Sequence, residues 1–217
     1  ERHGCMGKTE MWYVVDAKPG TYLYAGFSQV ITGDEYCRRV KDGTICEVLA
    51  KHPISAGDAF FIPAGRVHAI CGGALIAEVQ QSSDITYRIF DYNRMGMDGK
   101  PRELHTELAV DAIDYNVHPE YSISYPQEMN KANMVCECEY FTVRQLQLDT
   151  RRERNMQHYD SFLIYICLDG ECLIGEDIVL KKGQTCLIPA CCTDVVITPS
   201  SPNGAELLEV FVDNEKF

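Results

Sequence analysis

Three side chains in the first third of the chain have the chemical types of a metal-assisted site. Glu10 supplies a carboxylate and His68 an imidazole, which are ligands that suit Zn²⁺ and similar ions. Lys8 lies two positions before Glu10, so on an extended strand both side chains point to the same face. An ammonium there can bind a substrate oxygen or relay a proton. Taken as an isolated pair, a surface Glu and a structural His are the simpler interpretation.

A second group of side chains suits an anionic substrate. Arg88 and Arg94 are six residues apart and share a face along an extended chain. Two guanidinium groups on one face suit a phosphate or an anionic enediolate, and exposed salt bridges are the alternative. Asp84 lies four residues before Arg88. Glu78 and Gln80 are two positions apart on one strand, so we expect both to face the same pocket.

The elements that must position these side chains are almost all short strands. The predicted strands are rich in β-branched or aromatic residues and are bounded by Gly, Pro, Asp or Asn. They are residues 11–15, 22–27, 59–63, 75–80, 87–92, 141–148, 162–168, 185–189, 195–198 and 207–212. Strands this short and regular predict an all-β sandwich or barrel. Helical patterns occur at 34–51 and 103–113, and 118–133 is predicted to be a connecting segment.

An internal repeat divides the chain in two. Gly57–His68 and Gly183–Asp194 both follow G-x5-P-x-[G/C]-x2-[H/D], in which the glycine turns into a strand and the proline ends it. Upstream, Glu10–Gly20 and Asp160–Gly170 each join an acidic residue to a glycine ten positions later, so we expect the two acidic positions to correspond. Between this acidic residue and the glycine that opens the repeated motif, the first copy has 24 more residues than the second. This excess predicts a helix inserted at 34–51.

The composition excludes several classes of protein. The 217 residues carry a net charge of −12, which argues against a general nucleic-acid binder. No run of about 18 apolar residues is present, so no membrane span is expected. The 11 cysteines include no C-x-x-C pair, so neither a zinc ribbon nor a thioredoxin-type site is indicated. We expect buried, reduced thiols in a cytoplasmic protein.

Beyond this, the motifs resemble a known family. The spacing G-x5-P-x-G-x2-H of the first copy resembles a motif of the cupins, which are double-sheet jelly rolls. Four segments are similar, in order and spacing, to type I phosphomannose isomerase. They are Gly7–Tyr13, Pro63–Ile70, Glu78–Arg88 and Asp91–Arg94. The resemblance covers nearly all of 7–105, and the second half is similar mainly in its degenerate cupin pattern.

The resemblance implies a fold and a domain division. It implies an all-β bicupin of two double-stranded β-helix jelly rolls, with a short helix inserted in the first barrel. Residues 1–105 would form the catalytic barrel, 106–135 a linker with a short helix, and 136–217 a degenerate barrel. We expect the second barrel to bind no metal, because Asp194 replaces the histidine there.

The resemblance also implies an activity, the interconversion of mannose 6-phosphate and fructose 6-phosphate with a divalent metal, most simply zinc. The implied residues are the metal ligands Glu10 and His68, the catalytic group Arg88 with Lys8 or Asp84, and the substrate-binding Arg94, Glu78 and Gln80. The family's acidic residue at the position of Asp84 acts in catalysis or holds the arginine. A cupin that binds a sugar phosphate without converting it is the alternative. An iron-dependent dioxygenase would need two or three His at one metal, and only His68 is offered.

The third metal ligand is expected upstream. Family members carry another histidine before the Gly-Lys-Thr-Glu run, whereas only His3 precedes Glu10 here. A catalytic zinc usually has three protein ligands and an open position. We therefore expect an N-terminally shortened form that binds metal poorly and isomerises slowly or not at all. Strands absent from its first barrel would leave sheet edges open, which a homo-oligomer or strand exchange would cover.

Overall fold

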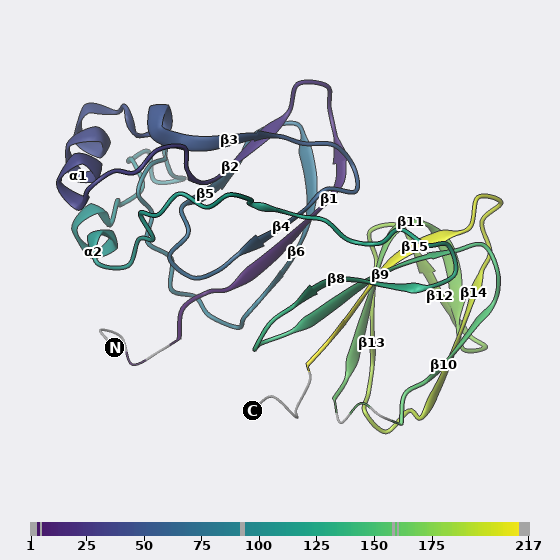
Figure 1. Ribbon diagram of the computed structural model, residues 1–217. Coiled ribbons are helices and arrows are strands. Elements are labelled where there is room, and N and C mark those ends of the chain that lie inside the picture. The colour runs from purple at the N-terminus through teal and green to yellow at the C-terminus, as the bar shows by residue number, and fades with distance from the viewer. Residues whose placement is uncertain (1–3, 5, 92–93, 158, 160, 213–217) are drawn as a thin grey trace. The chain divides into compact units, whose positions relative to one another are not determined.

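The chain consists of two compact units, Glu1–Ser122 and Ile123–Phe217, both built mainly from antiparallel strands (Figure 1). A computed structural model describes residues 4, 6–91, 94–157, 159 and 161–212, so His3 and Asp160 lie outside the described residues. Within those ranges no helix combines the length and the apolar character that crossing a bilayer requires.

Two antiparallel sheets form the first unit. Their strand orders are β6-β1-β4-β7 and β3-β2-β5. The strands are β1 (Glu10–Ala17), β2 (Tyr22–Phe27), β3 (Leu49–Pro53), β4 (Ala59–Ile62), β5 (His68–Ile70), β6 (Ala74–Gln80) and β7 (Ser122–Ile123). Apolar side chains of both sheets share one core, with Trp12 and Val14 from β1 and Leu23 and Ala25 from β2. The pleat of each strand turns alternate side chains to this core, so the position along a strand decides which side chains face the interior of the unit.

Helices cover one end of the first unit. Helix α1 (Gly33–Asp42) begins after Thr32, whose hydroxyl accepts a hydrogen bond from the Glu35 amide at 3.2 Å. It ends at Gly43 in the left-handed conformation, and a 3-10 turn η1 (Ile45–Val48) follows. The helix predicted over 34–51 is therefore wrong beyond 42, because the chain leaves η1 directly into β3. Helix α2 (Thr106–Val110) is shorter than the 103–113 predicted.

The second unit is one eight-stranded curled sheet. Its main path is β10-β14-β11-β15-β9-β8, and β12 and β13 both pair with β11. The strands are β8 (Ala132–Glu137), β9 (Thr142–Leu148), β10 (Arg152–Asn155), β11 (Leu163–Ile174), β12 (Ile178–Lys181), β13 (Thr185–Ile188), β14 (Asp194–Pro199) and β15 (Ala205–Phe211). The buried core contains Leu146, Leu163, Ile197 and Leu207.

The two copies of the repeat pair their strands in the same way, but the pairing aligns the copies differently from the sequence pattern. In the first unit β1 pairs with β4 and β6, and in the second β11 pairs with β13 and β15. Glu10 lies opposite Ile62, and at the equivalent place Leu163 lies opposite Ile188. The predicted correspondence of Glu10 with Asp160 is therefore wrong.

This difference in alignment has a physical cause in the second copy. Strand β11 continues without a break from Leu163 to Ile174, so Gly170 lies inside a strand and not in a turn like Gly20. Gly170 has a φ of +72°, and a Cβ on it would lie 2.2 Å from the Gly204 carbonyl oxygen. It sits just past a register shift between Cys167 and Asp169, and a glycine is needed there because another backbone approaches so closely.

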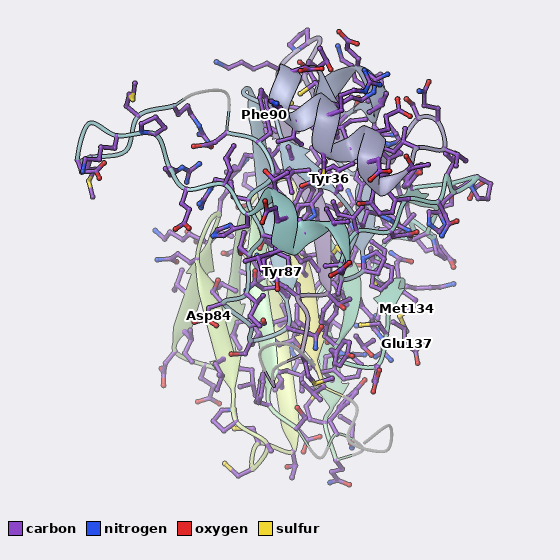
Figure 2. All side chains as sticks on the ribbon, turned by 90° about the vertical axis from the view of Figure 1, so that its left-hand side faces the viewer. Tyr36, Asp84, Tyr87, Phe90, Met134 and Glu137 are labelled. Carbon is purple, nitrogen blue, oxygen red and sulfur yellow. The ribbon has the colours of Figure 1, made fainter. Side chains whose placement is uncertain are left out.

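One predicted strand is not a strand. Residues 87–91 of the segment predicted at 87–92 have no strand conformation, and Tyr92 lies outside the described residues. Their apolar side chains pack instead with the two helices, in a cluster that contains Phe27, Tyr36 and Ala109 and is bordered by Tyr87 and Phe90. Figure 2 shows Tyr36, Tyr87 and Phe90 gathered about α1 and α2. The shared-face argument for Arg88 and Arg94 therefore loses its basis, because it required an extended strand.

Candidate active site

A cavity of about 720 Å³ opens in the first unit. It is lined by residues just before β1, by the turn between β4 and β5, by the segment 85–90 and by α2 with the residues that follow it. Lys8, Glu10, His68 and Arg88 all line it. Four sequence-predicted site residues therefore meet in one cavity although they are up to 80 positions apart in the chain.

Glu10 and His68 converge at the floor of this cavity. Glu10 Oε1 lies 3.6 Å from His68 Nε2. Two ligands at zinc-bonding distances and a tetrahedral angle are roughly 3.3 Å apart, so one ion fits between these atoms. Glu10 is 1% exposed, and its buried Oε1 lies 3.1 Å from the Lys8 ammonium. A carboxylate this buried needs opposite charge beside it, which Lys8 supplies in part and a bound cation would complete.

Neighbouring groups orient both ligands. Trp12 Nε1 donates to Glu10 Oε2 at 2.9 Å, which leaves Oε1 as the atom that faces the cavity. His68 Nδ1 lies 2.7 Å from the Arg66 carbonyl oxygen. A neutral ring donates there from Nδ1, so its Nε2 carries the lone pair that a metal ligand needs. The Trp12 and His68 rings also pack edge to face, with ring centroids 5.1 Å apart.

Lys8 connects these ligands to β6. Its Nζ lies 3.1 Å from Glu10 Oε1 and 3.3 Å from Glu78 Oε1. Burial lowers the pKa of Lys8, but the hydrogen bonds and charges of Glu10 and Glu78 outweigh it, so the pKa is raised. Lys8 is therefore an ammonium that can donate to a substrate oxygen. Gln80 lies opposite Glu10 in the β1–β6 register, so its side chain is on the same face.

Arg88 reaches the cavity from the segment that was predicted to be a strand. Its side-chain Nη1 donates to the Glu103 carbonyl oxygen at 3.2 Å. Its backbone N–H donates to His105 Nδ1 at 3.0 Å. The guanidinium has further N–H groups beyond the one that binds Glu103, and these are the natural partners of an anionic substrate.

Arg94 belongs to a separate cluster around Asp91. Arg94 donates to Asp91 Oδ1 at 2.6 Å, and Arg102 Nε donates to Asp91 Oδ2 at 2.6 Å. The hydrogen bonds from Arg102 and then Arg94 hold the pKa of Asp91 far below its usual range. Two guanidinium groups on one carboxylate leave a net positive charge at an exposed place. Asp84 is exposed and is not among the residues that line the cavity.

Several functional candidates were missed from the sequence. Arg66 lines the cavity, donates from Nη1 to the Phe61 carbonyl oxygen at 2.9 Å and has a pKa lowered by burial. Leu108 and Ile113 line the cavity from the α2 region. His105 binds Arg88. Arg66 stood inside a recognised motif, but nothing in the pattern of 103–113 signalled a role in the site.

In the second unit, the equivalent positions carry Leu163 and the exposed Asp194. There, Glu209 is fully buried and binds Arg154, and Tyr165 donates to it at 2.8 Å. The positive charge beside this buried carboxylate is therefore supplied by the guanidinium of Arg154. No three His, Cys, Asp or Glu side chains come together as a metal site anywhere in the described residues. In the first unit the candidate metal ligands among those residues are Glu10 and His68.

Known proteins are similar to this chain in sequence and in fold. Residues 130–200 match the family model described as "Mannose-6-phosphate isomerase, cupin domain". The curated mannose-6-phosphate isomerase ManA of Bacillus subtilis (strain 168) is 32% identical over 192 residues, covering 86% of this chain and 60% of that protein. The crystal structure of mannose 6-phosphate isomerase from Bacillus subtilis matches with a TM-score of 0.84 and 32% identity, over 97% of this chain and 66% of that one. The chain belongs to the type I phosphomannose isomerase family.

Further relatives agree on the family and the cupin fold. The mannose-6-phosphate isomerase of Streptococcus mutans serotype c is 32% identical over 196 residues, or 87% of this chain and 60% of that protein. A mannose 6-phosphate isomerase structure bound with zinc and yttrium shares the fold at a TM-score of 0.70 and 15% identity, over 95% of this chain and 66% of that one. The chain spans 60–62% of the length of the curated relatives ManA, YvyI and that of Streptococcus mutans. The family model matches within the second unit, whereas the motifs that resemble this family in the sequence lie in the first.

Proposed function

We propose that the first unit carries the active site of a metal-dependent aldose–ketose isomerase that interconverts mannose 6-phosphate and fructose 6-phosphate. The observation that carries the proposal is the convergence of Glu10 Oε1, His68 Nε2 and Lys8 Nζ in a cavity also lined by Arg88. The relatives named as mannose-6-phosphate isomerases support it. We further propose that the two units are the barrels of a bicupin, of which only the first is catalytic, in a cytoplasmic protein.

Glu10 and His68 fit a divalent cation, most simply zinc. The fit rests on the 3.6 Å separation and on the buried Oε1 of Glu10. A cation there would polarise the sugar carbonyl and stabilise negative charge on the oxygens in the transition state. Further protein ligands would have to come from outside the described residues, because within them only these two converge.

The chain's own groups supply proton transfer and charge stabilisation. The reaction removes a proton from C2 of the aldose, returns one to C1 and moves a hydroxyl proton between the two oxygens. Arg88 donates hydrogen bonds to the anionic enediolate formed between these steps. Lys8 lines the cavity whereas Asp84 does not, so the Lys8 ammonium is the better placed to donate a proton to the oxygen on C1 and to recover one from the hydroxyl on C2. Glu78 and Gln80 project from β6 beside Glu10 and are proposed to bind sugar hydroxyls.

Arg94 is proposed to anchor the phosphate. We expect Arg94→Ala to raise KM for the phosphorylated sugar about tenfold and to leave kcat within twofold, because a charged hydrogen bond far from the reacting carbons acts mainly in binding. Steady-state kinetics measure this. Arg38→Ala is the matched control, since the Arg38 and Arg94 side chains are both 64% exposed and each forms an i,i+3 ion pair. An unchanged KM in Arg94→Ala would remove the phosphate role.

The function is tested by incubating the chain and a divalent metal with mannose 6-phosphate and following fructose 6-phosphate. We expect conversion that is abolished by chelation and by His68→Ala. Asp194→Ala changes the equivalent position of the second unit and should leave the rate unchanged. Binding of mannose 6-phosphate without any conversion would contradict the proposal and identify a sugar-phosphate-binding module instead. Equal loss of activity in both variants would contradict the assignment to the first unit.

A further inference from the structure

Arg88 is tied to the start of helix α2 by three hydrogen bonds. Its backbone N–H donates to His105 Nδ1 at 3.0 Å, and its carbonyl oxygen accepts from the His105 backbone N–H at 2.8 Å. Its Nη1 donates to the Glu103 carbonyl oxygen at 3.2 Å. Residues 87–91 have no strand conformation, so these bonds replace the sheet ladder that would otherwise hold such a segment.

His105 is itself held firmly on the helical end of the unit. It is the residue that precedes α2, and its carbonyl oxygen accepts from the Ala109 N–H at 2.9 Å. Its side chain makes no capping bond to the helix. The ring instead turns to Arg88 and packs at 6.2 Å from the ring of Tyr87. The next residue, Thr106, accepts from the hydroxyl of the fully buried Tyr36 of α1 at 3.4 Å.

This arrangement transmits the rigidity of the two helices to a group in the cavity. A backbone N–H can donate to Nδ1 only while that nitrogen carries a lone pair, so the ring acts here as an acceptor. A residue without an acceptor at this place leaves the Arg88 N–H unpaired and frees the segment. Small displacements of a group that acts in a transition state have large kinetic effects.

We propose that His105 is a positioning residue, which holds Arg88 in the geometry that the reaction requires. This inference rests on the proposed isomerase function. His105 touches neither metal ligand, and it acts through the backbone and side chain of Arg88. Its removal therefore affects the step in which Arg88 acts, more than the binding of the sugar phosphate.

The test compares His105→Ala with His105→Asn. An asparagine Oδ1 is attached to Cγ, as Nδ1 is in histidine, so it can accept the same hydrogen bond. We expect His105→Ala to lower kcat about 10- to 100-fold with KM within threefold of the wild type. His105→Asn should recover kcat to within about threefold of the wild type. His118→Ala is the control, a histidine of the same unit that binds Asp114 at 2.6 Å, and it should change kcat less than twofold.

Amide hydrogen exchange at Arg88 tests the anchoring by His105 separately from the proposed isomerase activity. We expect faster exchange in His105→Ala and wild-type exchange in His105→Asn, whether or not the chain is active. If the wild type does not isomerise mannose 6-phosphate, the proposed function is contradicted. Exchange at Arg88 alone then decides whether His105 holds Arg88 in place. Exchange that is equal in all three proteins overturns the inference. So does a His105→Ala variant whose kcat stays at the wild-type value, or a His105→Asn variant as impaired as His105→Ala.

Discussion

Replacing Arg88 by alanine is expected to lower kcat and kcat/KM together by about 100-fold or more, which is typical for loss of one charged contact to a transition state. Arg88 lines the same cavity as Glu10 and His68, and its side chain donates a hydrogen bond to the Glu103 backbone carbonyl. Within the described residues no carboxylate forms an ion pair with it, so its charge is available to an anionic enediolate. The variant should keep its thermal midpoint, because the side chain lies at the edge of an open cavity.

Arg88→Lys is the informative companion to this variant. Lysine keeps the positive charge but lacks the planar fork that binds two oxygens, so an intermediate rate is expected. The measurement is steady-state kinetics in both directions, with thermal unfolding to show that each variant is folded. A kcat for Arg88→Ala within about twofold of the wild type would remove Arg88 from the mechanism.

The second large effect is expected on stability, from the buried pair Glu209–Arg154 in the second unit. Glu209 is fully buried, and Arg154 Nε donates to it at 3.0 Å while its own side chain is 13% exposed. Arg144 approaches the same carboxylate to 3.5 Å. Removing Glu209 leaves a guanidinium largely cut off from water without its counter-charge. We therefore expect Glu209→Ala to lower the free energy of unfolding by about 3–5 kcal/mol.

A control for this prediction lies in the same unit. Glu153 is 69% exposed and pairs with Arg151 at 2.6 Å, so Glu153→Ala should cost less than about 1 kcal/mol. The double variant Glu209→Met, Arg154→Met should recover most of the lost stability, because apolar side chains need no counter-charge. Denaturant unfolding of the four proteins measures these differences. A Glu209→Ala variant as stable as Glu153→Ala would contradict the account of a buried guanidinium that needs its counter-charge.

Local sequence pattern was enough to predict β1, which carries Glu10, together with β2 and β4, but it did not predict β5, which carries His68. The alternation and turn residues around 11–15, 22–27 and 59–63 match β1, β2 and β4 closely. The motif that ends at His68 and the two-residue spacing of Lys8 and Glu10 also led to two groups, Lys8 Nζ and His68 Nε2, that the fold brings within 3.6 Å of Glu10 Oε1. These features depend on contacts near in sequence or on one strand pairing.

Features that depend on tertiary contacts were not predictable in this way. Residues 87–91 alternate like a strand, but their apolar side chains cover the helices. Gly20 and Gly170 look equivalent in sequence, yet only the register of β11 shows that Gly170 lies within a strand. The anchor from His105 to Arg88 joins residues 17 positions apart through a ring nitrogen and a backbone amide. Such a bond leaves no periodic signal in the sequence.

The position of the metal tests the central claim most directly. Crystals of the chain grown with zinc, measured on both sides of the zinc absorption edge, locate the ion without assumptions about activity. The account predicts one anomalous peak within about 2.2 Å of Glu10 Oε1 and His68 Nε2 in the first unit, and none beside Asp194. A peak beside Asp194 with none at Glu10 and His68 would contradict it.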